Sequence, residues 1–436
     1  MNTPLLWTRR SLLATAAIAP AACAAGPAMM AGDHDSGRYL ATTEFEDQDT
    51  IWVTWGENGF LGGEPMTETL VPLIREISPH VRVRILYNQW TSWLDAEANP
   101  ETTRTPEEMH ARISARLTEA GVDLARIDFQ ITPMLFGAIQ DPGPVFLRRQ
   151  DGDMKIADFA SRHFDRKVSY LDRELVAPMG IAAISSQMKC DAGNRQCNGR
   201  GVLMVGGAFA QRINPEMSRA EMEAEYRRVQ GVEKVVWLNH GPREEDFDLL
   251  EDGRWGIGTG GHIDEFCRFV DARTVILAEV SEAERTLGPV LAETHRRMEE
   301  NLAILQAARD VDGNPFRILR APLPHLMTFK LAFDDLNPFE KYWFEGPGPG
   351  DEMEFYLPGS YTNFVIANEI VVTSSYWREG MDEKIRARDE EGLAAIQAAF
   401  PDRRVVQIHA TPLLHDGAGI HCYTRNQPVK RAKPRA

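Results

Sequence analysis

The residues best suited to chemistry are one cysteine near the C-terminus and two polar clusters far upstream of it. Cys422 lies in the run 417–424, whose glycines let the backbone approach a ligand and whose β-prone residues would hold the thiol in place. The upstream clusters span residues 140–144 and 261–264. A thiol, an imidazole and carboxylates separated in this way are typical of a Cys/His site that folding assembles.

Residue spacing indicates which histidine could serve the thiol. If residues 261–266 form an extended segment, His262 and Asp264 point to the same face and present a base and an acid together. By the same alternation, His421 points away from its neighbour Cys422, which makes His262 the better base. The alternative for His262 is a buried histidine whose hydrogen bonds are satisfied within the core.

Two other motifs in this region resemble ligand-binding patterns, one for a dinucleotide and one for a metal, but neither has the expected context. Residues 256–261 fit G-x-G-x-x-G, but they follow a charged loop and open no helix, so a dinucleotide site is not expected. His262, Asp264 and Cys267 could bind a metal, yet Cys267 would lie on the opposite face of an extended segment. Cys267 is therefore interpreted as a small core residue, and no metal is expected.

The N-terminus predicts export. Arg9 and Arg10 precede a weakly apolar stretch and a small-residue region, so residues 1–25 are interpreted as a twin-arginine export signal. The protein would then be periplasmic or secreted. Cys23 could instead carry a lipid anchor, although Pro20 stands where a lipobox prefers Leu or Val. Residues 26–45 are expected to be a flexible segment and residues 429–436 a basic tail.

Charge and cysteine usage limit the partners. The formal net charge is −16, which disfavours nucleic acid and anionic membranes and favours cationic substrates. No internal apolar run approaches the ~18 residues of a membrane-spanning helix. Cys190 and Cys197 bracket a turn-rich stretch, and in an oxidising compartment they could form a local disulfide.

The pattern of elements predicts a mixed α/β protein. β-branched and aromatic runs alternate with helical segments, and no linker divides the chain, so one domain is expected over residues 46–428. Capping boxes at Thr105 and Ser218 each predict the start of a helix. Longer helices are expected over residues 289–307 and 382–399, the second with a possible break at Gly392.

Five short motifs carry a resemblance to a known family. They are Asp141-Pro142-Gly143-Pro144, Asp191-Ala192-Gly193-Asn194, Gly261-His262-Ile263-Asp264, Ser360-Tyr361-Thr362-Asn363-Phe364 and Gly419-Ile420-His421-Cys422-Tyr423-Thr424. Together they resemble the agmatine deiminase and bacterial peptidylarginine deiminase family of guanidine-modifying enzymes, over most of the chain from about Trp52 onward. The terminal cysteine motif and the Gly-His-Ile-Asp segment are its most specific parts.

The resemblance implies a fold and a set of catalytic residues. The fold would be a five-bladed, pseudo-symmetric α/β propeller of repeated strand–helix units around a central site. Asp141 and Asp264 would bind a guanidinium, Cys422 would be the nucleophile, and His262 would act as acid and base. No cofactor is implied.

The resemblance also implies substrate contacts from Asp191, Asn194 and Asn363. A guanidinium carbon is a poor electrophile because its charge is delocalised, but two carboxylates can hold the N–H groups and fix the carbon over a nucleophile. A thiolate could then form a covalent thiouronium, whose hydrolysis gives a ureido product and ammonia. The expected substrate is agmatine, giving N-carbamoylputrescine, or peptidylarginine, giving citrulline.

Three departures from the family pattern leave the substrate open. Ala138 and Gln140 replace a Trp and an Arg near the first acid, and Asp191 replaces a Glu of the agmatine enzymes. Transfer of the amidino group to an amine is one alternative reaction. A guanidinium-binding protein without catalysis and an unrelated Cys/His hydrolase are alternative classes.

Overall fold

The computed structural model describes residues 37–59, 61–88, 104–132, 138–160 and 171–430. The predicted export signal, Cys23 and residues 431–436 of the basic tail lie outside the described residues. No helix in the described part of the chain has both the length and the apolar character needed to cross a membrane.

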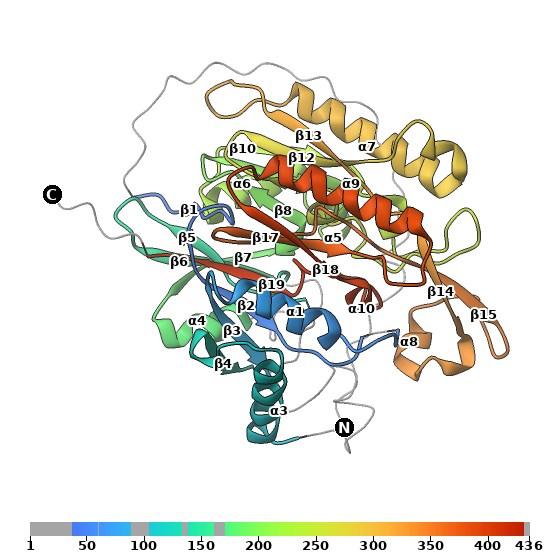
Figure 1. The fold of residues 1–436 in the computed structure, drawn as a ribbon. Coiled ribbons are helices and arrows are strands. Elements are labelled where there is room, and N and C mark those ends of the chain that lie inside the picture. The colour runs from blue at the N-terminus through green and yellow to red at the C-terminus, as the bar shows by residue number, and fades with distance from the viewer. Residues whose placement is uncertain (1–36, 60, 89–103, 133–137, 161–170, 431–436) are drawn as a thin grey trace.

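The architecture is mixed α/β, and five of its sheets repeat one pattern (Figure 1). Each of these sheets contains an antiparallel strand pair followed by a parallel pair joined by a connection that contains a helix. β1 (Leu40–Ala41) adds a second antiparallel pair to one sheet, and β4 (Ile127–Ile131) adds a second parallel pair to another. The repeat is one of topology, and no repeat of residue identity accompanies it.

The strands of these five sheets have the following bounds. The first sheet has the order β19 (Thr424–Pro428), β2 (Gln48–Thr54), β3 (Arg82–Tyr87) and β4 (Ile127–Ile131). The second has the order β1 (Leu40–Ala41), β5 (Val145–Arg148), β6 (Met154–Ala160) and β7 (Ala182–Lys189). The remaining three are β8 (Arg195–Cys197), β9 (Val202–Gly206) and β10 (Lys234–Leu238); β11 (Cys267–Phe269), β12 (Thr274–Glu279) and β13 (Arg317–Pro322); and β16 (Val365–Ala367), β17 (Ile370–Ser375) and β18 (Arg404–His409).

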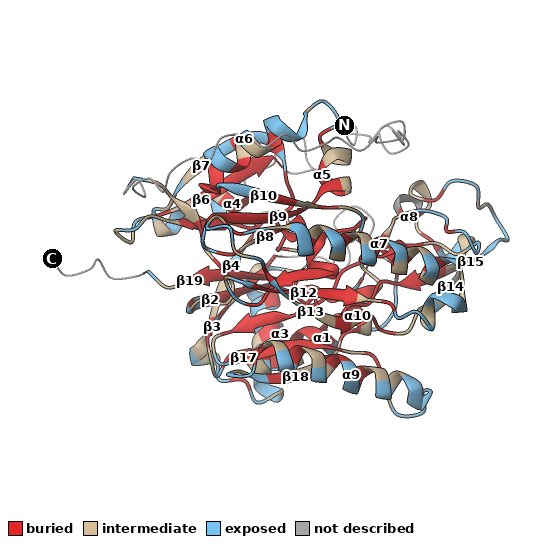
Figure 2. Ribbon diagram, turned by 90° about the horizontal axis from the view of Figure 1, so that it is seen from above, coloured by how far each residue is buried: buried red, intermediate tan, exposed pale blue. Residues whose placement is uncertain are grey.

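The longer helices lie outside the sheets with one side exposed, whereas strands such as β2, β9 and β12 are buried along most of their length (Figure 2). The α-helices are α1 (Thr67–Ile77), α3 (Pro106–Glu119), α4 (Leu171–Val176), α5 (Gly207–Ile213), α6 (Arg219–Gln230), α7 (Pro289–Ala307), α8 (Pro338–Tyr342), α9 (Glu383–Ala399) and α10 (Thr411–Leu414). A separate hairpin of β14 (Met327–Ala332) and β15 (Glu352–Leu357) encloses α8 at one edge of the molecule (Figure 1).

The expected helix boundaries are confirmed because local chemistry determines them. Thr105 and Ser218 each form a complete capping box at the start of α3 and α6. Gly231 ends α6 in the left-handed conformation that glycine adopts without strain. Residues 363–373 form one β-prone run in the sequence, but in the structure they contribute to a hairpin of β16 and β17, which turns at Asn368 with a φ of 57°.

The described part of the expected flexible segment 26–45 is packed into the domain. β1 pairs with β5, and the side chain of Glu44 hydrogen-bonds to Arg268 and His421. Toward the C-terminus, β19 pairs with β2, so both ends of the described part of the chain are built into the sheets. The domain therefore begins before residue 46, and only residues 26–36 of the expected segment lie outside the description.

Gly392 does not break α9, and its lack of a side chain makes room for Tyr361. A β-carbon at Gly392 would lie 2.7 Å from the ring of Tyr361. That ring is buried, and its hydroxyl donates a hydrogen bond to Asp389 Oδ1 at 2.6 Å. The ring therefore has no free space into which it could retreat.

We expect Gly392→Ala to destabilise the protein, although alanine is the better helix former by about 1 kcal/mol. Overpacking a filled core costs typically ~1–3 kcal/mol, which outweighs that gain. Thermal unfolding should show a lower Tm for Gly392→Ala and almost no change for Glu390→Ala on the exposed side of the same helix. A Tm equal to or above that of the wild type would contradict the packing argument.

Candidate active site

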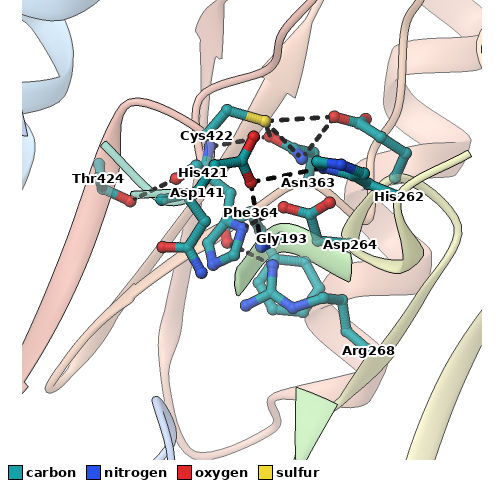
Figure 3. A network of polar contacts seen from close by, with 12 residues as sticks. Asp141, Gly193, His262, Asp264, Arg268, Asn363, Phe364, His421, Cys422 and Thr424 are labelled. Atoms are coloured by element: carbon teal, nitrogen blue, oxygen red, sulfur yellow. Dashed lines mark hydrogen bonds and ion pairs between the residues drawn. The ribbon is translucent and has the colours of Figure 1, made fainter. Parts of the chain in front are cut away.

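The predicted site residues all lie on loops that lead into the first antiparallel strand of a sheet. These residues are Asp141 before β5, Asp191 and Asn194 before β8, His262 and Asp264 before β11, Asn363 before β16, and Cys422 before β19. Five sheets thus contribute equivalent loops, and these bring together residues that are up to 281 positions apart in the sequence. Figure 3 shows Asp141, His262, Asp264 and Cys422 in one cluster.

Gly193 lies where two carboxylates and an imidazole converge. A β-carbon on this glycine would lie 2.8 Å from Asp141 Oδ1, 2.9 Å from His262 Nδ1 and 3.2 Å from Asp264 Oδ2. The Gly193 amide donates a hydrogen bond to Asp141 Oδ1 at 3.2 Å. The three functional groups can therefore be this close only because position 193 carries no side chain.

The segment that carries His262 and Asp264 is not extended, so that part of the prediction is wrong. His262 is followed by a 3₁₀ turn over Ile263–Glu265. The turn still directs both side chains to the cluster around Gly193, as predicted. A short turn can place residues i and i+2 on one side without strand alternation, which the sequence pattern alone did not indicate.

His262 lies between two acids. Its Nδ1 is 3.5 Å from Asp141 Oδ1, and its Nε2 is 3.4 Å from Asp191 Oδ2. The ring packs edge-on against Phe209, with centroids 4.4 Å apart. Asp141, Asp191 and His262 also have the composition of a metal site, since each offers one ligand atom and these atoms all lie within 4.8 Å of one another.

Cys422 lies in a turn directly before β19 and is buried. Its Sγ is 3.5 Å from Asn363 Nδ2 and 3.4 Å from Glu265 Oε1. Its backbone carbonyl accepts a hydrogen bond from the amide of Gln140 at 2.9 Å. These contacts fix the sulfur at the junction of three site loops.

Burial and nearby acids keep the thiol protonated in the absence of a ligand. Desolvation is the main cause that raises the pKa of Cys422 well above its ordinary value. The negative charges of Asp264, Glu265 and Asp141 raise it further. A thiolate in this site therefore needs a positive charge close by.

His421 supports Asp264 and does not contact the thiol. Its Nδ1 lies 2.7 Å from Asp264 Oδ2, and its Nε2 lies 2.9 Å from Glu44 Oε1. Burial opposes the charged form of His421, but the two acids outweigh burial and raise its pKa. The expectation that His421 is not the base for Cys422 is supported, although a turn and not strand alternation directs its ring away.

Glu44 and Arg268 are members of the site that sequence reasoning missed. Arg268 is fully buried, donates to Glu44, and binds the carbonyl of Phe364 at 3.0 Å. Burial opposes the charge of Glu44, but His421 and Arg268 hold the pKa of Glu44 well below its usual range. One sequence signal existed: Arg268 lies between Cys267 and Phe269 in an otherwise apolar segment, where a charge needs a partner.

The remaining predicted contacts differ in their surroundings. Asn363 lies at the nucleophile, whereas the amide of Asn194 donates to the carbonyl of Gly206 at 3.0 Å and holds the backbone of β9. Gln140, at the position of the family Arg, is buried and reaches Glu44 Oε1 at 3.4 Å. Ala138 is partly buried beside the main hydrophobic core.

The predicted disulfide between Cys190 and Cys197 is wrong, because both thiols are free. Cys190 Sγ lies 3.6 Å from the hydroxyl of Tyr226, while Cys197 is at the end of β8 and pairs with Leu203. The stretch between the cysteines is not a surface loop. It carries Asp191 and Asn194 and then enters a sheet, so each thiol is held in a different structural element.

We expect alkylation of Cys422 by iodoacetamide to accelerate with pH and to keep accelerating beyond about pH 9, because only the thiolate reacts and its pKa is raised. Peptide mapping by mass spectrometry measures the rate at this residue, with Cys422→Ser as the blank. A rate that levels off below pH 8 would contradict the raised pKa.

Comparison with known proteins shows which family the chain belongs to. Residues 40–428 match the family model of Porphyromonas-type peptidyl-arginine deiminase. The chain is 24% identical over 410 residues to an agmatine deiminase of Pseudomonas aeruginosa (strain LESB58), covering 90% of this chain and 96% of that protein. It is 25% identical to an agmatine deiminase of Pseudomonas putida, again over 410 residues, covering 89% and 95%.

Solved structures share the fold. The agmatine deiminase of Enterococcus faecalis superposes with a TM-score of 0.68 at 18% identity, covering 92% of this chain and 99% of that one. An agmatine deiminase of C. jejuni superposes with a TM-score of 0.63 at 14% identity, covering 90% and 96%. With the family match extending over most of its length, the chain belongs to the Porphyromonas-type peptidyl-arginine deiminase family.

Proposed function

We propose that this protein hydrolyses a guanidino group to a ureido group and ammonia. The observation that carries the proposal is the meeting of a buried thiol, two carboxylates and an imidazole on the loops of three sheets. A planar cation with N–H groups on two edges matches such a pair of carboxylates. Membership of a deiminase family supports the same chemistry.

In the proposed reaction, Asp141 and Asp264 hold the guanidinium with its carbon facing Cys422. The thiolate adds to that carbon, and His262 transfers a proton to the departing nitrogen, which leaves as ammonia. The remaining cysteine thiouronium is attacked by a water that His262 deprotonates. Collapse of this second adduct releases the ureido product and the sulfur.

The substrate itself supplies the charge that the nucleophile needs. The acids around Cys422 raise its pKa, and a guanidinium bound to those acids offsets their negative charge. The thiolate is therefore favoured only when a cation occupies the site. This coupling limits reaction of the nucleophile with neutral molecules.

For the fold we propose that the five repeated sheets surround a pseudo-fivefold axis, with the site at its centre. Equivalent loops from five sheets that converge on one cluster support such a closed arrangement. A closed ring of units also explains why β2, near the start of the domain, pairs with β19, the last described strand.

Agmatine is the substrate we propose first, because the relatives and superposed structures described above carry that activity in their names. Peptidylarginine is the second candidate, supported by the family model and by the expected export through the twin-arginine pathway. Cleavage of residues 1–25 and a periplasmic or secreted location remain part of the proposal. N-terminal sequencing of the protein from a periplasmic fraction tests them.

We expect agmatine to yield equal amounts of ureido product and ammonia when incubated with the purified protein, with free arginine and an arginine-containing peptide tested in parallel. Colorimetric ureido detection and an ammonia assay measure the products, and Cys422→Ala should abolish both. Amidino transfer would appear as a new guanidino compound, without ammonia, when an amine is added. Folded protein that yields no ureido product from any of the three substrates would contradict the proposal.

We expect Asp264→Asn to lower kcat/KM by roughly 30-fold or more, because loss of one partner of a buried charge pair costs about 2–5 kcal/mol. Steady-state kinetics with the best substrate measures the effect. Asp402→Asn, at an exposed position, is the matched control and should behave as wild type. Activity of Asp264→Asn within threefold of wild type would remove Asp264 from the site.

A further inference from the structure

Glu265 is a buried carboxyl group in direct contact with the nucleophile, and the mechanism above gives it no role. Glu265 follows Asp264 in the 3₁₀ turn, and its Oε1 accepts a hydrogen bond from the Cys422 thiol at 3.4 Å. Glu265 is only 2% exposed. A carboxyl group in this environment is costly unless it is used or well paired.

Asn363 holds Glu265 Oε1 against the sulfur. Its Nδ2 donates to this oxygen at 2.8 Å and lies 3.5 Å from Cys422 Sγ. Its Oδ1 accepts the backbone amide of His421 at 2.8 Å, and Gly419 leaves space for it, since a β-carbon there would lie 2.3 Å from this oxygen. The thiol, the amide and the carboxyl group therefore form one fixed unit.

His262, by contrast, faces other groups. Its two ring nitrogens lie near Asp141 and Asp191, and its ring packs in a T-shaped contact with Phe209. Among the described residues, the carboxylate that accepts the thiol hydrogen bond is Glu265. The acid that serves the leaving nitrogen and the base that serves the sulfur can thus be different residues.

We propose that Glu265 is the catalytic base that accepts the proton of Cys422, while His262 serves only the leaving group and the water. The proposal rests on the proposed deiminase function. When the substrate binds, the S–H proton moves to Glu265 Oε1, giving a thiolate and a neutral carboxylic acid. The sulfur adds to the guanidinium carbon, and the proton returns from Glu265 to the sulfur when the second adduct collapses.

The strengths of the two groups suit this transfer. Burial raises the pKa of Glu265 well above its ordinary value, and the charges of Glu245 and Asp264 raise it further. Because its own pKa is raised, the Glu265 carboxylate is a better acceptor for the thiol proton than an exposed carboxylate would be. The titratable or charged groups that face Glu265 are Glu245, Asp264, Arg268, Tyr376 and Cys422.

The test compares Glu265→Gln with Glu244→Gln. Glu244 is an equally buried neighbour that accepts a hydrogen bond from Thr294 and has no contact with Cys422. With the best guanidino substrate we expect Glu265→Gln to lower kcat about 100-fold or more, the usual effect of losing a general base, with KM changed less than threefold. The residual rate should rise with pH, because the thiol must then lose its proton to solvent. Glu244→Gln should keep the kcat and pH profile of the wild type.

A second readout needs no turnover. The pH at which iodoacetamide labels Cys422 at half its maximal rate should move to lower pH in Glu265→Gln, because one of the charges that raise the thiol pKa is gone. In Glu244→Gln the pH of half-maximal labelling should equal that of the wild type. Unchanged kcat and unchanged labelling in folded Glu265→Gln would overturn the proposal. If the wild type turned over no guanidino substrate, the proposed function would be wrong. The labelling experiment would still test the contact between Glu265 and Cys422, because it needs no substrate.

Discussion

The site depends on a chain of buried, alternating charges that runs from Arg268 through Glu44 and His421 to Asp264. Each link is a direct hydrogen bond, and Arg268, His421 and Asp264 are fully buried. Removing one partner of a buried ion pair typically destabilises a protein by about 3–5 kcal/mol, because the other charge is left buried and unpaired. The cations therefore allow a carboxylate to remain in the interior while its other oxygen is left for a ligand. Around Cys422, the charges of Asp264, Glu265 and Asp141 raise the pKa of the thiol, and this is why the site favours a cationic molecule.

This chain of charges also joins distant parts of the protein. Arg268 belongs to β11, Glu44 follows β1, and His421 precedes β19. The guanidinium of Arg268 also binds the carbonyl of Phe364 at the start of β16 and stacks over its ring at 4.5 Å. Four sheets are thus connected through the side chains of Arg268 and Glu44. Loss of a member would displace several site loops together, because none of these loops has a regular element of its own beyond a short turn.

The elements of the fold were accessible from the sequence, and the site was accessible in part. Capping boxes and apolar periodicity act over a few residues, so α3, α6 and α7 could be predicted closely. The pairing of Cys190 with Cys197 and the extended form of residues 261–266 were wrong, because both depend on which sheet each loop enters. Glu44 was missed for the same reason: its segment looks flexible until β1 pairs with β5.

By itself the sequence determined the residue types that can act on a guanidinium, since the motifs that carry Cys422, His262, Asp141 and Asp264 are local strings. The tertiary structure decided how these residues are grouped. Asn363 lies beside the thiol, whereas Asn194 binds the backbone carbonyl of Gly206. His421 binds Asp264, although it is the sequence neighbour of Cys422. The tertiary structure also revealed Glu265 beside the sulfur. The physical reason is that direction and charge environment arise from contacts between residues far apart in the chain, which local patterns do not encode.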